Sequence, residues 1–163
     1  MTGDTGQTRK TRRRRVMLVA SGGGHWVELM RLTPAVEDCS LAFVTVQRDY
    51  EYQTRRFEGS RYYVVFDVTR WNKIRWIQTV VQLMVILVRE RPDVILSTGA
   101  LPGFFALRLG KLFGARTVWV DSIANVEELS KSGQKIGPHA TLWLTQWPHL
   151  AKEGGPEYKG AVL

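Results

Sequence analysis

From Val16 onward, short apolar runs rich in β-branched residues alternate with longer segments whose apolar residues repeat at helical spacing. Runs that are apolar throughout are typical of parallel strands covered on both faces. The expected strands are 16–21, 41–46, 62–68, 94–97, 117–121 and 141–145, and the expected helices are 25–33, 72–91 and 102–113. We therefore predict an α/β fold: a Rossmann-like parallel sheet with helices on both faces.

The net charge of +8 is concentrated at the N-terminus, where six of the 23 Lys and Arg residues lie between residues 9 and 15. Residues 1–14 lack apolar periodicity and are predicted to form a disordered basic arm. Residues 15–163 are predicted to form one folded domain, because 44% of the chain is hydrophobic. The arm either meets phosphates on a membrane or nucleic acid, or simply keeps the protein soluble.

The compartment follows from what the sequence lacks. Cys39 is the single cysteine, and no Cys/His spacing suggests a metal site, so we expect a reducing, cytoplasmic setting without a metal. The apolar run 16–21 is too short for a signal peptide. The longest apolar stretch, 76–88, falls short of the roughly 20 residues that a membrane-spanning helix needs. Any membrane contact is therefore expected to be peripheral.

Three expected strands end in polar or glycine-rich loops, which should meet at one edge of the sheet. In the first loop, three glycines between Ser21 and His25 let backbone N–H groups approach a phosphate or pyrophosphate. A dinucleotide fingerprint would need glycine at Val27, and a P-loop would need Lys and Ser/Thr after the last glycine. Neither NAD nor ATP, and no other cofactor, is predicted.

His25 is the candidate general base, because the positive end of a helix dipole favours the neutral imidazole. Glu28, three residues later, is the second catalytic candidate. Alternatively, His25 only caps the helix and Glu28 is a capping partner. The second and third loops either bind the ligand or are ordinary connections and caps. The candidate acceptor- or phosphate-binding residues are Ser21, Gly22, Gly23, Gly24, Thr98, Gly99, Gly103, Asp121 and Ser122.

The expected helix 72–91 begins with aromatic and basic residues, a mixture suited to the headgroup region of a membrane. Alternatively, it is an ordinary helix covering the sheet. The predicted membrane contacts are Arg12, Arg13, Arg14 and Arg15 in or beside the arm, and Trp71, Lys73, Arg75 and Trp76 at the start of this helix.

Several short motifs occur in a recognisable order, although none is specific alone. They are Gly23-Gly24-His25-x-x-Glu28-Leu29, the loop from Ser97-Thr98-Gly99 to Pro102-Gly103, Asp121-Ser122, Leu129-Ser130-x-Ser132-Gly133-x-x-x-x-Pro138, Gln146-Trp147-Pro148-x-Leu150 and Tyr158-x-Gly160. Over about residues 16–163, the ordered set resembles the subunit that anchors the eukaryotic transferase adding the second N-acetylglucosamine to dolichol-linked sugar. It also resembles that subunit's bacterial relatives in capsule and exopolysaccharide synthesis.

This resemblance implies a GT-B glycosyltransferase split into two chains. This half would hold the lipid-linked acceptor and the membrane, while a separate chain would bind the nucleotide-sugar donor. The glycine loop is also similar to that of the lipid-II-forming N-acetylglucosaminyltransferase. By that analogy Gly22, Gly23 and Gly24 would face the acceptor pyrophosphate and His25 would be the base. The chain ends soon after Gly160, where a complete GT-B enzyme would continue, so we expect it to be inactive alone.

Two features depart from the family pattern. The family commonly has Glu-Ser-x-x-Arg where this chain has Asp121-Ser122-x-x-Asn125. An arginine-rich arm also stands where the eukaryotic subunits have a membrane-spanning helix, which favours a bacterial-type, peripheral protein.

The predicted activity is transfer of a sugar from a nucleotide donor to a polyprenyl-diphosphate-linked saccharide, at the cytoplasmic face of an anionic membrane. The alternative is a non-catalytic adaptor that docks on the membrane and activates its partner. Nucleic-acid binding is not expected, because the folded part lacks aromatic and basic residues interleaved on a strand platform.

Overall fold

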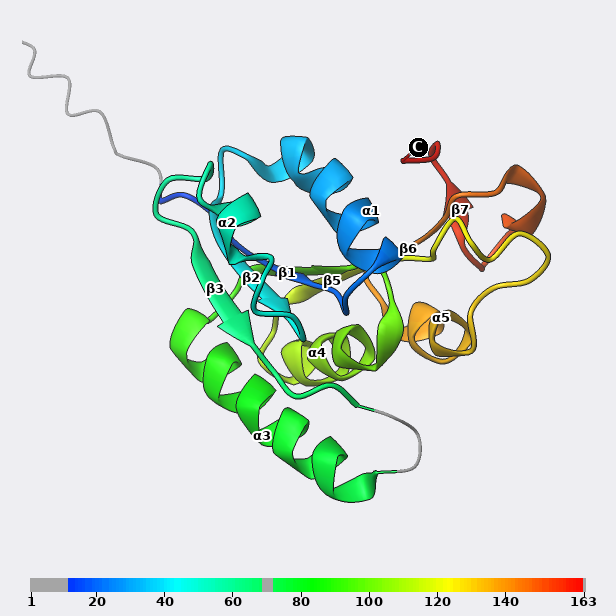
Figure 1. Ribbon diagram of the computed structural model, residues 1–163. Coiled ribbons are helices and arrows are strands. Elements are labelled where there is room, and N and C mark those ends of the chain that lie inside the picture. The colour runs from blue at the N-terminus through cyan, green and yellow to red at the C-terminus, as the bar shows by residue number, and fades with distance from the viewer. Residues whose placement is uncertain (1–11, 69–71, 163) are drawn as a thin grey trace, which may run out of the picture.

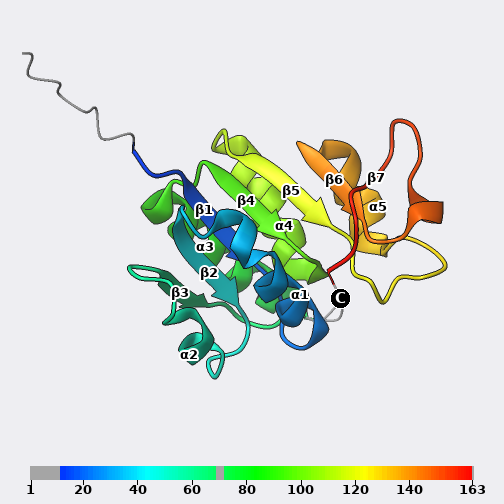
Figure 2. The same cartoon turned by 90° about the horizontal axis from the view of Figure 1, so that it is seen from above.

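The computed structural model describes residues 12–68 and 72–162, and its centre is a parallel sheet with strand order β3-β2-β1-β4-β5-β6-β7 (Figures 1 and 2). The strands are β1 (Arg15–Val19), β2 (Ser40–Thr45), β3 (Arg61–Val64), β4 (Val94–Ser97), β5 (Arg116–Val120), β6 (Leu142–Thr145) and β7 (Glu157–Tyr158). The helices are α1 (Gly24–Leu32), α2 (Glu51–Thr54), α3 (Lys73–Glu90), α4 (Ala100–Leu112) and α5 (Lys131–Ile136), with 3-10 turns at Thr33–Val36, Gly137–His139 and Pro148–Leu150. The predicted Rossmann-like fold is confirmed.

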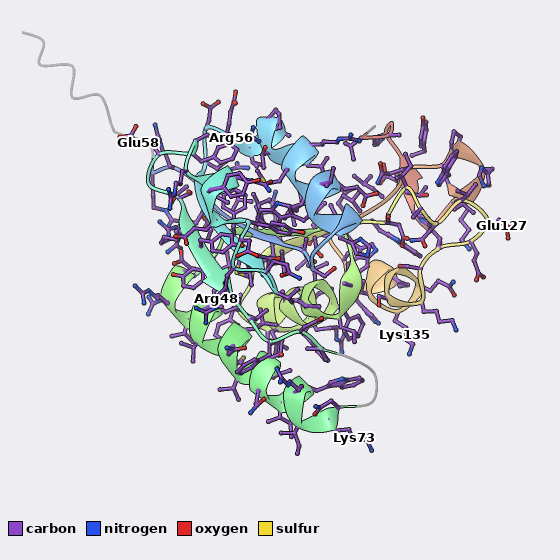
Figure 3. The ribbon with its side chains drawn as sticks, in the orientation of Figure 1. Arg48, Arg56, Glu58, Lys73, Glu127 and Lys135 are labelled. Carbon is purple, nitrogen blue, oxygen red and sulfur yellow. The ribbon has the colours of Figure 1, made fainter. Side chains whose placement is uncertain are left out.

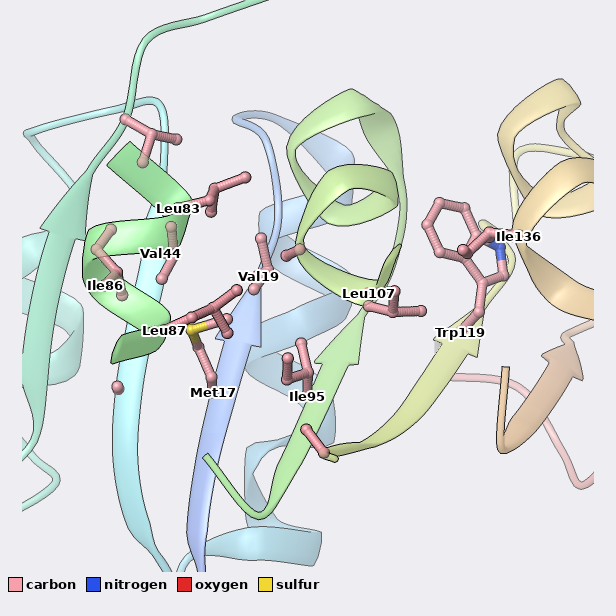
Figure 4. Packing of buried hydrophobic residues seen from close by; sticks show 14 residues of the cluster. Met17, Val19, Val44, Leu83, Ile86, Leu87, Ile95, Leu107, Trp119 and Ile136 are labelled. Atoms are coloured by element: carbon pink, nitrogen blue, oxygen red, sulfur yellow. The ribbon is translucent and has the colours of Figure 1, made fainter. Parts of the chain in front are cut away.

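Helices cover both faces of the sheet, with α1 and α2 on one face and α3, α4 and α5 on the other (Figure 1). Alternate residues of β1 serve the two faces. Met17 and Val19 belong to the core cluster with α3 and α4, and Leu18 belongs to the cluster with α1. Figure 4 shows Leu83 and Leu87 of α3 pointing toward the strands in the first of these clusters.

The predicted strand 62–68 is wrong in its second half, because β3 ends at Val64. Beyond it, side chains of α3 satisfy the backbone of Phe66. Its N–H donates to Gln82 Oε1 at 2.9 Å, and its carbonyl accepts from Thr79 Oγ1 at 3.1 Å. The chain therefore leaves the sheet to follow the helix.

Residues 12–14, the end of the predicted arm, contact the folded body. The backbone N–H of Arg15 donates to Asp93 at 2.8 Å, and the guanidinium of Arg12 donates to the same carboxylate at 2.7 Å. These bonds, chiefly the one from the Arg15 backbone, hold the pKa of Asp93 below its ordinary value. Residues 12–14 of the predicted arm thus lie against the start of β4. Residues 1–11 lie outside the described ranges.

The strand order reverses between β1 and β4, where the chain winds away in both directions. At such a point the loops following the two strands diverge and leave a crevice beyond their carboxyl ends. We call this side of the molecule the carboxyl edge and the opposite side the amino edge. The three predicted ligand-facing loops, after β1, β4 and β5, all lie at the carboxyl edge.

Candidate functional site

His25 joins the loop after β1 to the loop after β4. Its Nδ1 lies 3.0 Å from the carbonyl oxygen of Thr98, and Thr98 Oγ1 donates to the His25 carbonyl at 2.6 Å. Because a carbonyl oxygen can only accept, Nδ1 carries the proton in the neutral ring and Nε2 keeps the lone pair. The side chain is 32% exposed. The contact at Nδ1 thus leaves Nε2 as the basic nitrogen of a partly exposed ring.

Gly99 makes room for this ring. A Cβ at residue 99 would lie 2.5 Å from His25 Cε1, and the backbone has φ 142°, which disfavours other residues. The adjoining Ala100 has φ 65°, a strained conformation for a residue with a Cβ. Strain of this kind is commonly retained where a site needs a particular backbone path. Gly99 therefore supports His25 sterically, in addition to lining the cavity beside it.

Glu28 connects three strand ends from a buried position. Its Oε1 accepts from Ser122 Oγ at 3.0 Å and from the Ile123 N–H at 2.8 Å, and Gln146 Nε2 lies 3.4 Å away. Its Oε2 has no hydrogen-bond partner in the described residues and lies 3.9 Å from His25 Nδ1. No side chain caps the N-terminus of α1. Glu28 is therefore part of the site's framework, and the capping-box alternative does not hold.

Asp121 anchors the loop that follows β5. It is 1% exposed and accepts from Trp119 Nε1 at 3.1 Å, from Ser130 N and Oγ at 3.1 and 3.0 Å, and from the Asn125 side chain. Because these donors occupy both carboxylate oxygens, we assign Asp121 a structural role in place of the predicted acceptor contact. Gly103 is likewise structural, since it is buried where a Cβ would lie 1.9 Å from Ser97 Oγ.

A polar cavity of about 330 Å³ lies beside His25 at the carboxyl edge. Four of the predicted site residues line it: His25, Thr98, Gly99 and Ser122. Ser21, Gly22, Gly23 and Gly24 are not among its lining residues. Gly23 has φ 68°, so this glycine is needed for the turn into α1.

The sequence analysis did not select the other wall of the polar cavity as site residues. This wall comes from the loop before α5 and from the first turn of that helix, and it includes Asn125, Glu128, Ser130, Lys131 and Ser132. The sequence signals for it were the Ser130-x-Ser132-Gly133 motif and Asn125, which departs from the family pattern. Together the two walls place a basic imidazole nitrogen near hydroxyl groups and a lysine. Such a set can take a proton from a hydroxyl while neighbouring donors hold an anion.

The predicted membrane contacts fall in two places. Arg12 to Arg15 lie at the amino edge, whereas Lys73, Arg75 and Trp76 begin α3 at the carboxyl edge. The Trp76 ring packs against Phe105 with centroids 5.6 Å apart, and Trp71 lies outside the described residues. None of the helices in the described ranges combines the length and apolar character needed to cross a bilayer.

Comparison with protein families gives a match over residues 16–162 to the family described as "Oligosaccharide biosynthesis protein Alg14 like". The chain is 26% identical to the UDP-N-acetylglucosamine transferase subunit ALG14 of Mus musculus, over 91% of this chain and 83% of that protein. It is 42% identical to the corresponding subunit of Schizosaccharomyces pombe over a shorter segment, 44% of this chain and 37% of that protein.

Among solved structures, MurG of Acinetobacter baumannii superposes with a TM-score of 0.74 at 11% identity, over 92% of this chain and 46% of MurG. A UDP-N-acetylglucosamine 2-epimerase from Rickettsia bellii superposes with a TM-score of 0.65 at 13% identity, over 92% of this chain and 45% of that chain. The chain thus spans about half the length of these structures and shares the fold of one half of each.

Proposed function

This chain belongs to the Alg14-like family of oligosaccharide biosynthesis proteins, and we propose that it is the acceptor-binding subunit of a two-chain glycosyltransferase. A separate chain would bind the nucleotide-sugar donor. The acceptor would be a polyprenyl-diphosphate-linked saccharide at the cytoplasmic face of the membrane. Curated relatives are named as subunits of a UDP-N-acetylglucosamine transferase, which supports both the transferase activity and the second chain. The observation that carries the acceptor role is the orientation of His25 beside the polar cavity.

The chemistry follows from that orientation. His25 Nε2 takes the proton of an acceptor hydroxyl. At the same time the oxygen of that hydroxyl bonds to the anomeric carbon of the donor sugar. The bond from that carbon to the nucleotide diphosphate breaks, and the partner chain holds the leaving diphosphate. Hydroxyls and Lys131 of the polar cavity face the diphosphate of the acceptor.

The partner requirement is the direct test of this proposal. We expect no transfer to a polyprenyl-diphosphate-linked sugar when this chain is assayed alone with nucleotide sugars, because it would not supply the donor site. Transfer should begin when the donor-binding chain is added, and it is measured by chromatography of the lipid-linked product. Sustained transfer by this chain alone would contradict the division of labour. An inert mixture of both chains with every matched acceptor would contradict the activity itself.

An apolar stripe along the outer face of α3 supports peripheral membrane contact. Ile74, Ile77, Val81, Val85 and Val88 repeat at helical spacing, and each is at least 53% exposed. The opposite face of α3 packs on the sheet, so the helix is apolar on both sides. An interfacial helix lies in the membrane plane with its apolar face in the headgroup region. We propose that α3 lies along the membrane in this way.

The apolar stripe runs between the two predicted membrane-contact regions, which are residues 12–15 and the start of α3. Val88 in the last turn of α3 and Arg15 at the start of β1 line one cavity at the amino edge, together with Arg91. Lys73 and Arg75 flank the other end of the helix. A helix lying flat would therefore bring both basic regions to one surface, although they lie at opposite edges of the sheet.

Two sets of substitutions should separate the apolar and electrostatic contributions to membrane binding. Ile77→Ser with Val81→Ser should lower sedimentation with anionic liposomes at high salt by roughly tenfold or more, because the lost contacts are insensitive to salt. Arg13→Ser with Arg14→Ser should lower mainly binding at low salt, by roughly fivefold per arginine. If the unaltered protein fails to sediment at low ionic strength, with or without its partner, the docking proposal is wrong.

A further inference from the structure

A second cavity, of about 890 Å³, opens beside the polar cavity between the start of α3, α4 and α5. Its wall is mainly apolar and aromatic, and includes Trp76, Leu101, Phe104 and Phe105. Its volume is in the range typical of ligand pockets. We call it the apolar groove. Side chains of this kind are normally buried in a core, so an open cavity lined by them indicates an apolar ligand.

The groove and the polar cavity are continuous. Ala100, Lys131 and Ser132 line both of them. Lys135, one turn along α5 from Lys131, is also at the wall of the groove. Figure 3 shows Lys135 on α5 and Lys73 at the start of α3 on the same side of the molecule. Positive charge is thus placed where the apolar wall gives way to the polar one.

We propose that the apolar groove binds the first isoprene units of the acceptor's prenyl chain, with the acceptor diphosphate beside Lys131 and Lys135. This inference rests on the proposed function and adds a subsite to it. A lipid-linked sugar has three parts in fixed order: an apolar chain, a diphosphate and a saccharide. The molecule presents matching surfaces in the same order: the apolar groove, the two lysines and the polar cavity with His25.

The position of the groove suits a ligand whose tail stays in the bilayer. Trp76 lies on the groove wall and belongs to the first turn of α3, two residues from the exposed Ile74 of the apolar stripe. A chain leaving the groove at this end would meet the helix proposed to lie on the membrane. The groove would therefore hold the prenyl units nearest the diphosphate, while the rest of the chain remains in lipid.

Acceptors that differ only in prenyl length test the subsite in the complete two-chain enzyme. The same sugar diphosphate would carry one, two, three, four or eight isoprene units, and KM and kcat would be measured in detergent. We expect KM to fall by about tenfold for each unit added from one to three, because each is buried in the groove. It should then level off, with kcat unchanged. A KM that does not depend on prenyl length would overturn the proposal. So would a KM that keeps falling beyond three units as the acceptor partitions more strongly into the micelles.

A single substitution localises the effect. Leu101→Ser, on the groove wall, should raise KM for the three-unit acceptor by about tenfold and so reduce its advantage over the one-unit acceptor. The matched control is Leu112→Ser at the far end of α4, where the leucine is 81% exposed. If Leu101→Ser fails to fold, Leu101→Met provides a volume-conserving replacement that should keep the length dependence. Equal responses of Leu101→Ser and Leu112→Ser would contradict the assignment of the groove.

Two further results distinguish a prenyl subsite from a groove filled by phospholipid and from failure of the proposed function. Adding excess phosphatidylglycerol to the micelles should leave the length dependence intact. Its loss would mean that a phospholipid chain occupies the groove, and would overturn the proposal. Failure of the groove alone would leave robust, partner-dependent transfer that ignores prenyl length. Failure of the proposed function would instead abolish transfer for acceptors of every length.

Discussion

Replacing His25 with alanine is expected to lower turnover of the two-chain enzyme by about 10²- to 10⁴-fold, the usual contribution of a general base. The ring is held by the Thr98 carbonyl at Nδ1, so in the proposed mechanism Nε2 would receive the acceptor proton. Removing the ring takes this proton acceptor away. Rates would be measured with saturating donor and acceptor, so that a loss in kcat is distinguished from weaker binding.

The control for this substitution is His139→Ala. His139 is exposed in the turn before β6, at the amino edge and away from the polar cavity. The His139→Ala substitution should leave turnover unchanged. Both variants should keep the unfolding temperature of the parent protein and co-purify with the partner chain. A folded, partner-bound His25→Ala protein with near-normal turnover would leave His25 as a structural residue, and would favour the non-catalytic adaptor.

The sheet could be predicted because its central strands carry their own signal. These strands are covered on both faces, so Leu18 on one face and Ile95 on the other are both buried, and apolar residues run without interruption. The helix α5 and the strand β7 carry no such signal. Helix α5 has only six residues, three of them exposed, and β7 has two exposed residues that gain their structure by pairing with β6. Structure that depends on a distant partner is not encoded locally.

The site was predictable in part for the same reason. A histidine after three glycines at a helix start is a local pattern, and His25 lies where that pattern places it. The roles of the two acidic residues are not local. Glu28 binds partners 94 to 118 residues away, and Asp121 binds donors on its own loop. From the sequence, Asp121 was either a ligand contact or an ordinary cap, and Glu28 was either a catalytic residue or a capping partner. The two carboxylates could be told apart only from their hydrogen bonds.

The apolar stripe on the outer face of α3 has helical spacing in the sequence, but the sequence does not show that it faces outward. Its residues follow helical spacing from Ile74 to Val88, and so do the buried residues on the opposite face. A helix that is apolar on both faces looks like a buried helix in sequence. The aromatic and basic residues at its start are the part of this helix that stands out in the sequence. That the stripe faces outward along the whole of α3 depends on how the helix packs on the sheet.

Glu28→Ala should produce the largest loss of stability among substitutions at the site, about 3 kcal/mol in the free energy of unfolding. It removes the acceptor for Ser122 Oγ and the Ile123 N–H, and one of the two acceptors of the Gln146 amide, which also donates to the Asp121 carbonyl at 3.1 Å. For a chain of this size the unfolding temperature should fall by about 6–12 °C. Turnover should also fall by about 10²-fold, because the loop carrying Ser122 would lose its position beside His25.

Two companion variants make this prediction specific to the hydrogen bonds of Glu28. Glu28→Gln keeps an acceptor oxygen for Ser122 and Ile123 and should lose only about 1 kcal/mol. Glu127→Ala removes an exposed carboxylate from the loop before α5, where it extends away from the body (Figure 3), and should change neither stability nor turnover. Thermal and denaturant unfolding of the three proteins give the comparison. If Glu28→Ala unfolds at the same temperature as Glu127→Ala, the carboxylate does not hold the three strand ends together, and the framework assigned to this site is wrong.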